Sequence, residues 1–521
     1  MKKILILSLA LFPPVCFGAT YTVCPGGCNE TTIQAVFDNN DLEPGDVVIV
    51  ASGTYNEQVV WGEDDGGDEN NGVILQAAGD CIIDGQQVRD YGILVRDVNH
   101  TKTDGFTIRN CLVNGHRIVG TTENGITGAV VTRTSVTNTG PGVAGDVSRG
   151  TGFIALQTGY GHGIIQGVEY SQCVSSSNAR HGYDTRWRVY ATYADCVADG
   201  NGKGVLAHGF TTHPVSSKFT AGWTLSGGTV YYRPVVNTYD NERRVYDMEG
   251  LRLDRDDSAG VSPAVGKFSV TGGQVYVNFG RDPNGRTIVS IRQPNKSVYT
   301  RCRASRTASY EGVDGHGMVT DDSTEANEYW WCTSYDNDGD GFSTLRGANA
   351  LFVRCVSCNN GRDGFYHFNA TGNVYYNNTA VNNTRYSFSS INAGSTNYSI
   401  YNNIAYGGIT GIYSNSAPPA AEHHNMVYGA SSANFSGITP DVSDLQVDPI
   451  FCSSVDFHIQ ETSPARGAAS DGGDIGAYEY IAPTCFDGIQ NQDETGIDCG
   501  GVCPACKGTT VPGAPANLHA H

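Results

Sequence analysis

Five titratable residues share one short motif, in which each precedes a glycine and an apolar residue. They are His181, Lys203, His316, Asp340 and Asp363. If these motifs stack as repeats, imidazole, ammonium and carboxylate groups form one column that can bind sugars and exchange protons with them. The residues that we expect to bind substrate are His181, Asp184, His316 and Asp363, and Lys203 is a catalytic candidate. The alternative is that Asp before Gly simply suits turns.

A second group lies three residues after the apolar position of the motif and consists of Arg186, His208 and Asp321. Small residues precede each of them, so alternation along a strand predicts that the three side chains point outward. A His beside a carboxylate can hold a proton acceptor near neutral pH, and Arg can grip a carboxylate with two hydrogen bonds. We predict that Arg186, His208 and Asp321 are catalytic, with Lys203 as an alternative base. A surface row of ion pairs is the competing interpretation.

Carboxylates form a third group, because Asp314 and Asp338 each lie two residues before a member of the first column. Oxygen ligands of this kind suit Ca²⁺, or give one carboxyl a raised pKa for acid catalysis. We predict a calcium site at Asp314, Asp338 and Asp340, with a second candidate in the acidic loop 485–499. An EF-hand is excluded, because Gly347 stands where its last ligand would be. Solvated turn residues are the alternative.

These groups need a scaffold that repeats every 23 residues. Cys173 and Cys196 are 23 residues apart, and so are Cys332 and Cys355. An Asn follows each Cys after five residues and continues the period, at Asn178, Asn201, Asn337, Asn360 and Asn383. Stacked coils place equivalent residues ~4.8 Å apart, so the Asn amides can form a ladder and the Cys side chains can pack inside without disulfide bonds. The period predicts an all-β fold, a β-solenoid.

Both ends of this repeat carry short motifs of a known kind. The motifs are Cys24-Pro-Gly-Gly-Cys28, Ile33-Gln-Ala35, Pro44-Gly-Asp46, Gly53-Thr-Tyr55, Asp448-Pro-Ile-Phe451, Asp456-Phe-His-Ile459 and Asp474-Ile-Gly-Ala-Tyr478. Over residues 20–480 the chain resembles secreted right-handed parallel β-helix proteins related to pectate lyases. The resemblance implies a right-handed parallel β-helix over residues 19–482 and a role in carbohydrate chemistry, as in β-helix polysaccharide lyases and glycosidases. It does not imply one reaction.

Alternating strands and turn residues interrupt the period at about residues 217–297, which predicts an antiparallel β insertion. Residues 31–37 read as a short helix that covers the first coil. Four Cys residues between 483 and 507 predict a Cys-rich module held by disulfides, with zinc as the alternative. Residues 508–521 resemble a linker and the opening of a fibronectin type III domain, so we expect the natural protein to continue.

The first 18 residues combine two Lys with an apolar run, which predicts a signal peptide; a short buried helix is the alternative. We therefore expect a secreted or cell-surface protein in which Cys24 and Cys28 can pair. No later apolar run suits a membrane span. The formal net charge of −20 argues against nucleic acid as a partner.

Polysaccharide is the partner that these observations favour, and the function is an extracellular carbohydrate-active protein that cleaves it. A lyase acting on uronate polymers needs a base, which His208 or Lys203 would supply, and a cation for the uronate carboxylate, such as Arg186 or Ca²⁺. A glycoside hydrolase needs two carboxyl groups, for which Asp321 with Asp314 or Asp340 qualifies. The alternative is a non-catalytic, adhesin-like solenoid that binds glycans.

Overall fold

The computed structural model describes residues 18–480 except 123, 141–148, 159–162, 203–207, 214, 220–222, 235–243, 248–251, 256–258, 266, 272–273, 285–287, 294–295, 310–314, 322–326, 347–348 and 393. The predicted Cys-rich module and linker lie outside these residues. The chain forms two units, Met1–Asn327 with Asn337–Gly339 and Glu328–Asp336 with Asp340–His521. Each unit is described by itself. Among the described residues, no helix has the length and apolar character to span a membrane.

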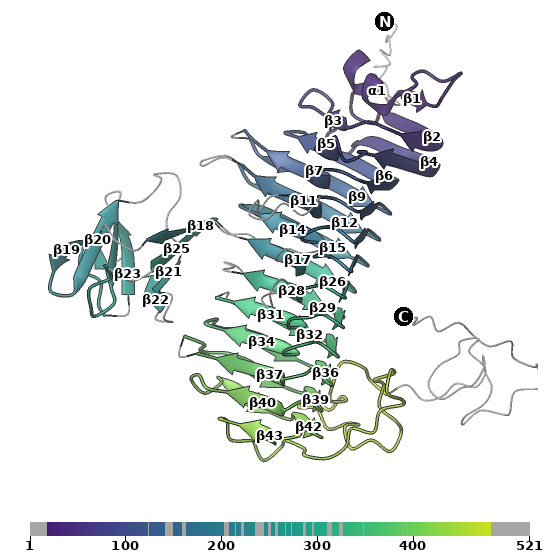
Figure 1. Cartoon of the computed structure of the whole chain (residues 1–521). Helices are drawn as coiled ribbons and strands as arrows, with labels where there is room; N and C mark the ends of the chain where they lie inside the picture. The colour runs from purple at the N-terminus through teal and green to yellow at the C-terminus, as the bar shows by residue number, and fades with distance from the viewer. Residues whose placement is uncertain are drawn as a thin grey trace, which may run out of the picture. The chain divides into compact units, whose positions relative to one another are not determined.

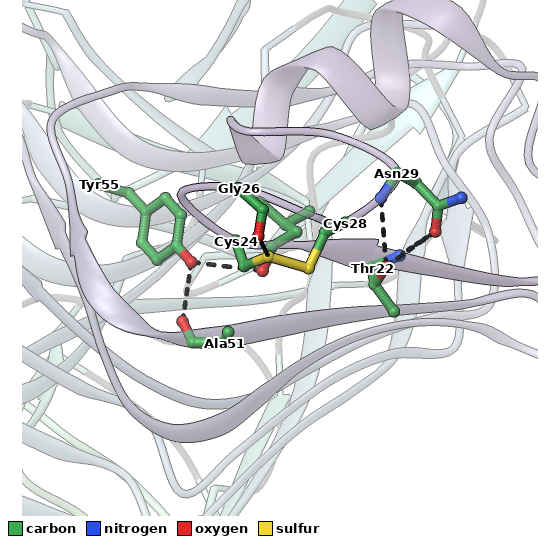
Figure 2. The surroundings of a disulfide bond; sticks show 8 residues. Thr22, Cys24, Gly26, Cys28, Asn29, Ala51 and Tyr55 are labelled. Atoms are coloured by element: carbon green, nitrogen blue, oxygen red, sulfur yellow. Dashed lines mark hydrogen bonds between the residues drawn. A yellow bond between two sulfur atoms is a disulfide. The ribbon is translucent and has the colours of Figure 1, made fainter.

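Unit 1 begins with strand β1 (Thr20–Val23) and helix α1 (Ile33–Asn39), which lies close to the predicted bounds. Thr32 caps the helix, because its side chain accepts a hydrogen bond from the Ala35 amide. Ile33, Val36 and Phe37 form its buried face. Between strand and helix, Cys24 and Cys28 form a disulfide bond, and the Tyr55 hydroxyl donates to the Ala51 carbonyl nearby (Figure 2).

The solenoid of unit 1 consists of two parallel sheets whose strands stack as successive rungs (Figure 1). The first sheet contains β1, β2 (Val47–Tyr55), β4 (Val73–Asp84), β6 (Thr101–Arg109), β8 (Ile126–Thr127), β9 (Ala129–Thr132), β10 (Ser135–Thr137), β12 (Ile165–Ser171), β13 (Val174–Ser176), β15 (Val189–Ala194), β16 (Val197–Asp199), β26 (Lys296–Thr300) and β27 (Arg303–Ser305). The second sheet contains β3 (Val59–Trp61), β5 (Tyr91–Arg96), β7 (Asn114–Gly120), β11 (Thr151–Gln157), β14 (Tyr183–Arg186), β17 (His208–His213) and β28 (His316–Asp321).

Unit 2 repeats this plan. Its first sheet contains β29 (Glu328–Trp330), β30 (Thr333–Tyr335), β32 (Leu351–Val353), β33 (Val356–Cys358), β35 (Val374–Tyr376), β36 (Thr379–Val381), β38 (Ser399–Tyr401), β39 (Ile404–Tyr406), β41 (Ala421–His423) and β42 (Met426–Tyr428). Its second sheet contains β31 (Phe342–Leu345), β34 (Phe365–Phe368), β37 (Tyr386–Ile391), β40 (Thr410–Ser414) and β43 (Ala433–Ser436). The chain is thus an all-β parallel solenoid, as predicted.

The predicted insertion leaves the solenoid after β17 and returns before β26. Its eight strands are β18 (Val215–Phe219), β19 (Thr224–Gly227), β20 (Val230–Pro234), β21 (Arg244–Asp247), β22 (Arg252–Arg255), β23 (Lys267–Thr271), β24 (Gln274–Asn278) and β25 (Ile288–Gln293). The pairing is antiparallel except between β22 and β23, which run parallel. Trp223, Leu253 and Phe268 belong to a buried apolar cluster of this sheet, so it has a core of its own.

Stacked side chains fill the solenoid interior. In unit 1, the Tyr183 ring lies 4.9 Å from Phe153 and 4.5 Å from Phe210, centroid to centroid, with nearly parallel planes. In unit 2, Phe365 stacks in the same way on its neighbours at 4.8 Å on both sides. Cys173, Cys196, Cys302, Cys332 and Cys355 are buried free thiols, so the prediction that they pack without disulfides is confirmed.

The Asn ladder is present in both units. The Asn178 side-chain amide donates to Asn201 Oδ1 at 3.1 Å, and the Asn360 amide donates to Asn383 Oδ1 at 2.8 Å. A second ladder, which the sequence analysis missed, runs through Asn378, Asn403 and Asn425 in unit 2.

The uniform 23-residue period is wrong for part of unit 1. Phe342, Phe365 and Phe388 of unit 2 lie opposite one another at the predicted 23-residue steps. In unit 1, however, Tyr183 lies opposite Phe210, 27 residues later. The four extra residues follow Asn201, so the first sheet keeps its register while the second sheet changes it. This shift decides which residues meet in the candidate site.

Candidate functional site

Three imidazole rings stack where strands β14, β17 and β28 of the second sheet in unit 1 begin. His208 lies opposite His316 on the neighbouring strand, and its ring is 5.5 Å from the His316 ring and 5.2 Å from the His181 ring. The planes differ by only 17° and 18°. All three precede a glycine and an inward-facing apolar residue. The column therefore contains His181, His208 and His316, whereas the predicted column of His181, Lys203 and His316 is wrong.

Lys203 lies outside the described residues. Its exclusion from the column follows from the strand register alone. Because Phe210 and not Val205 lies opposite Tyr183, the motif of this rung is His208-Gly209-Phe210. The repeated His-Gly-aromatic sequence was visible at residues 181–183 and 208–210, but the 23-residue spacing selected Lys203 instead.

A backbone hydrogen bond fixes the tautomer of the neutral His181 imidazole. The His208 amide donates a hydrogen bond to His181 Nδ1 at 3.1 Å. An accepting Nδ1 carries no proton, so the proton of the neutral ring is on Nε2. His181 Nε2 lies 4.0 Å from Asp184 Oδ2, which places this proton toward a carboxylate.

Asp184 and Arg186 form a buried ion pair on the outer face of β14. Arg186 Nε donates to Asp184 Oδ2 at 2.5 Å, and the two residues are 6% and 0% exposed. Tyr183 and Thr185 alternate with them and point inward, where Thr185 Oγ1 lies 2.5 Å from the Tyr193 hydroxyl. Asp184 thus links His181 to Arg186 through one carboxylate oxygen.

The predicted column of Arg186, His208 and Asp321 is wrong at its middle member, because the register places His213 and not His208 between Arg186 and Asp321. Arg186 lies opposite His213, whereas His208 lies opposite His316 at the other end of the strand. Asp321 ends β28 next to Thr320, which lies opposite Thr212. The chain therefore separates His208 from the register of Arg186, and the imidazole that lies near Asp184 is that of His181.

Arg117 extends this outer face toward the N-terminus, and the sequence analysis missed it. It lies on β7, opposite Leu94 on one side and Ile154 on the other. The guanidinium lies 5.1 Å from the centroid of the Tyr91 ring, and its Nη1 donates to the Tyr91 hydroxyl at 3.3 Å and to Asn114 Oδ1 at 3.4 Å. Burial lowers the pKa of Arg117, and the nearby cations Arg186 and Arg96 lower it further.

The same column position in unit 2 carries carboxylates. Asp340 and Asp363 are fully buried, and the Asp363 amide donates to Asp340 Oδ1 at 3.0 Å. Arg385 binds Asp363 with two hydrogen bonds of 2.6 and 2.7 Å, and the Ser389 hydroxyl donates to Asp363 Oδ2 at 2.5 Å. Burial raises the pKa of Asp363, while Arg385 acts in the opposite direction. Each oxygen of Asp363 is thus already bonded within the protein.

The predicted metal ligands do not assemble among the described residues. Asp338 is exposed and accepts hydrogen bonds from the Ser309 amide and hydroxyl, and Asp340 lies 3.8 Å from Arg362 Nε. Asp314 lies outside the described part of the chain. No group of three or more His, Cys, Asp or Glu residues in that part is arranged to hold a metal ion. We therefore derive no step through calcium.

Comparisons with known proteins give structural neighbours only. No family model matches the sequence, and no curated protein matches it. The periplasmic alginate epimerase AlgG is similar over 80% of this chain and 83% of its own, with 8% identity and a TM-score of 0.45. For the pectate lyase Pel9A these values are 89%, 96%, 14% and 0.39. For the GH136 lacto-N-biosidase from Eubacterium ramulus they are 82%, 68%, 10% and 0.47. These neighbours are carbohydrate-active proteins.

The outer face of the second sheet in unit 1 is the strongest candidate site. It carries the Asp184–Arg186 pair on β14 and Arg117 on β7, and the buried imidazole column lies beside it where β14, β17 and β28 begin, with His181 Nε2 4.0 Å from Asp184 Oδ2. The signal that would have found Arg117 is its place three residues after Asn114, because Asp184 stands three residues after His181. Asn114 occupies the same column position, opposite Thr151, but no titratable residue marks it.

Proposed function

We propose that unit 1 is a secreted polysaccharide lyase that cleaves a uronate polymer along the outer face of its second sheet. The observation that carries the proposal is the column of three imidazoles beside an Asp–Arg pair. Imidazole is the usual general base at neutral pH, and a guanidinium is suited to a substrate carboxylate.

β-Elimination assigns a role to each of these groups. His208 removes the proton from C5 of the uronate, the electron pair forms the C4–C5 double bond, and the C4–O bond breaks. The leaving oxygen takes a proton from an acid, and His316 is our candidate for this acid among the described residues. Arg186 faces the substrate carboxylate and stabilises the negative charge that develops there. His181 is a positioning residue, because its Nδ1 accepts the His208 amide and its Nε2 faces Asp184.

Hydrolysis is less well supported. It needs two carboxyl groups that can reach the glycosidic bond. The paired carboxylates of unit 2, Asp340 and Asp363, are fully buried, and Asp363 is bonded to Arg385 and Ser389. Both oxygens of Asp363 are already bonded within the protein, so this carboxyl group is not free to act on a glycosidic bond.

Location and attachment belong to the same proposal. The signal-like first 18 residues and the Cys24–Cys28 disulfide suit an oxidising compartment outside the cytoplasm. The Cys-rich residues 483–507 would attach the enzyme to a cell surface. Calcium binding remains a prediction. Titration of Ca²⁺ into chelator-treated protein, followed by calorimetry, tests it.

The decisive experiment is incubation of the full chain with a panel of pectic, alginate and neutral polysaccharides. Ultraviolet absorbance of unsaturated ends on an acidic polymer is the expected result. New reducing ends without this absorbance identify a hydrolase and refute the lyase. Binding without any product identifies the non-catalytic solenoid instead.

A further inference from the structure

Arg117 is a half-buried cation for which the described residues supply no carboxylate partner. Within the described part of the chain, its side-chain partners are the Tyr91 hydroxyl and Asn114 Oδ1, both uncharged and both at more than 3.2 Å. The equivalent residues on the two adjacent rungs are the buried Leu94 and Ile154. A cation in such surroundings loses water and gains no ion pair, which lowers the stability of the fold.

The nearby charges make this arrangement less favourable still. Arg186 and Arg96 both lower the pKa of Arg117, so they lie close enough to repel it. Asp184, two rungs away and therefore about 10 Å along the stack, already pairs with Arg186. Arg117 thus lies near two other guanidinium groups, in a protein whose formal net charge is −20.

Stacking on Tyr91 does not by itself explain why a cation is present. A cation–π contact stabilises a side chain by less than the burial of an unpaired charge costs. Other arginines of this unit show the usual solution, because Arg109 and Arg133 each pair with an aspartate. An anion that arrives from outside would pair Arg117 in the same way.

We propose that Arg117, with Tyr91 beside it, forms an anion subsite that binds the carboxylate of a second uronate residue. The subsite lies on β7, two rungs from the Asp184–Arg186 pair on β14, so it takes a sugar away from the scissile bond. The inference rests on the proposed function for the class of substrate. Its test measures binding, so it succeeds or fails separately from catalysis.

The test compares the full-length wild-type protein with Arg117→Gln and Arg301→Gln in titration calorimetry. Arg301→Gln is the matched control, because it removes one positive charge from an exposed ion pair with Asp195 in the same unit. The probes are short oligogalacturonates and oligomannuronates, together with their methyl esters, which keep the ring and remove the charge. His208→Ala is titrated as well, because it separates binding from cleavage.

We expect Arg117→Gln to weaken binding of a charged oligomer by about 10-fold or more, the scale of a lost charge-assisted hydrogen bond. Binding by wild type should weaken with added salt and with esterification, and Arg301→Gln should behave as wild type. Arg117→Gln should also keep or raise the melting temperature, because it removes an unpaired buried charge.

Equal binding of acid and ester by wild type would overturn the proposal, and so would unchanged affinity in Arg117→Gln. If that variant kept its affinity and had a lower melting temperature, Arg117 would serve only to pack on Tyr91. Failure of wild type to bind any charged oligomer in the millimolar range would also reject the subsite. Loss of cleavage in His208→Ala with binding retained would support the two assignments separately.

Discussion

The two units use the same step of the solenoid coil in opposite ways. In unit 1 the residue before the glycine is His181, His208 or His316, and these imidazoles stack beside one Asp–Arg pair. In unit 2 it is Asp340 or Asp363, and these carboxylates face Arg362 and Arg385 respectively. The scaffold position is equivalent, but the chemistry differs.

The difference shows how to separate structural charges from functional ones on a repetitive fold. Arg385 forms a two-fold hydrogen bond with Asp363 and lies 4.9 Å from the centroid of the Tyr386 ring, so its charge is fully used within unit 2. Arg117 of unit 1 has only uncharged partners among the described residues. A repeat whose charges pair internally stabilises the stack, whereas a repeat that leaves a charge unpaired is suited to a ligand.

The largest expected effect is on catalysis in unit 1. His208→Ala should lower kcat on the cleaved polymer by at least ~100-fold, the scale of a lost general base. The melting temperature should change by only a few degrees, because Asn201 and the aromatic stacks remain. His423→Ala in unit 2 is the control. Full activity of His208→Ala would remove the imidazole column from the mechanism.

Sequence reasoning predicted the solenoid because several neighbouring rungs of the first sheet keep the 23-residue spacing. Cys173 and Cys196, and Asn178 and Asn201, keep 23 residues and occupy neighbouring rungs. The strands of the second sheet follow turns of variable length. The 23-residue spacing therefore predicted Lys203 at the position that His208 occupies. A repeat length fixes register only on the side of the coil where no residues are added.

The 23-residue spacing could not reveal the importance of Arg117. Its neighbours Leu94 and Ile154 come from coils 23 and 37 residues away, and the longer coil has no counterpart in the motif series. The unfavourable surroundings of this cation exist only once the three strands are paired. Sequence alone shows an arginine among many.

The second prediction concerns the charges of unit 2. Asp363→Asn should lower the free energy of unfolding by about 2 kcal/mol, because it leaves the Arg385 guanidinium without its buried partner. The matched variant is Asp195→Asn in unit 1, where both partners are largely exposed, and it should cost about 0.5 kcal/mol. Urea unfolding followed by circular dichroism measures both. Equal costs would contradict the distinction between a buried and an exposed pair.

The third prediction tests what the two units share. Asn360→Ala and Asn201→Ala each remove a side-chain amide that is buried in the ladder and bonded to a neighbouring rung. Each substitution should lower the free energy of unfolding by about 1–2 kcal/mol, because a buried carbonyl loses its hydrogen-bond donor. Asn70→Ala, at an exposed position, is the control. If one ladder residue proved as tolerant as Asn70, the ladders of the two units would not be equivalent supports.

The smallest expected effect depends on pH and involves Glu422 in unit 2, whose neighbour is another carboxylate. The Asn425 side-chain amide donates to Glu422 Oε1 at 3.0 Å, and the Asp441 amide donates to both Glu422 Oε2 and Asp444 Oδ2. Burial, together with the hydrogen bond and charge of Asp444, raises the pKa of Glu422 to about 8 from the ordinary value of 4.5. The folded protein therefore keeps a proton that the unfolded chain releases.

The sign of the pH dependence follows from this proton. Its stabilising contribution is complete below pH ~4.5 and is lost as the pH rises through about 8, because the unfolded state then binds fewer protons than the folded state. Glu422→Gln should remove this loss and raise the melting temperature by a few degrees at pH 8 relative to wild type, with little difference at pH 4.5. Glu461→Gln, at an exposed position, should show no such trend. Parallel curves for wild type and Glu422→Gln across this range would show that Glu422 and Asp444 do not share a proton, and that unit 2 neutralises its carboxylates here as it does at Asp363.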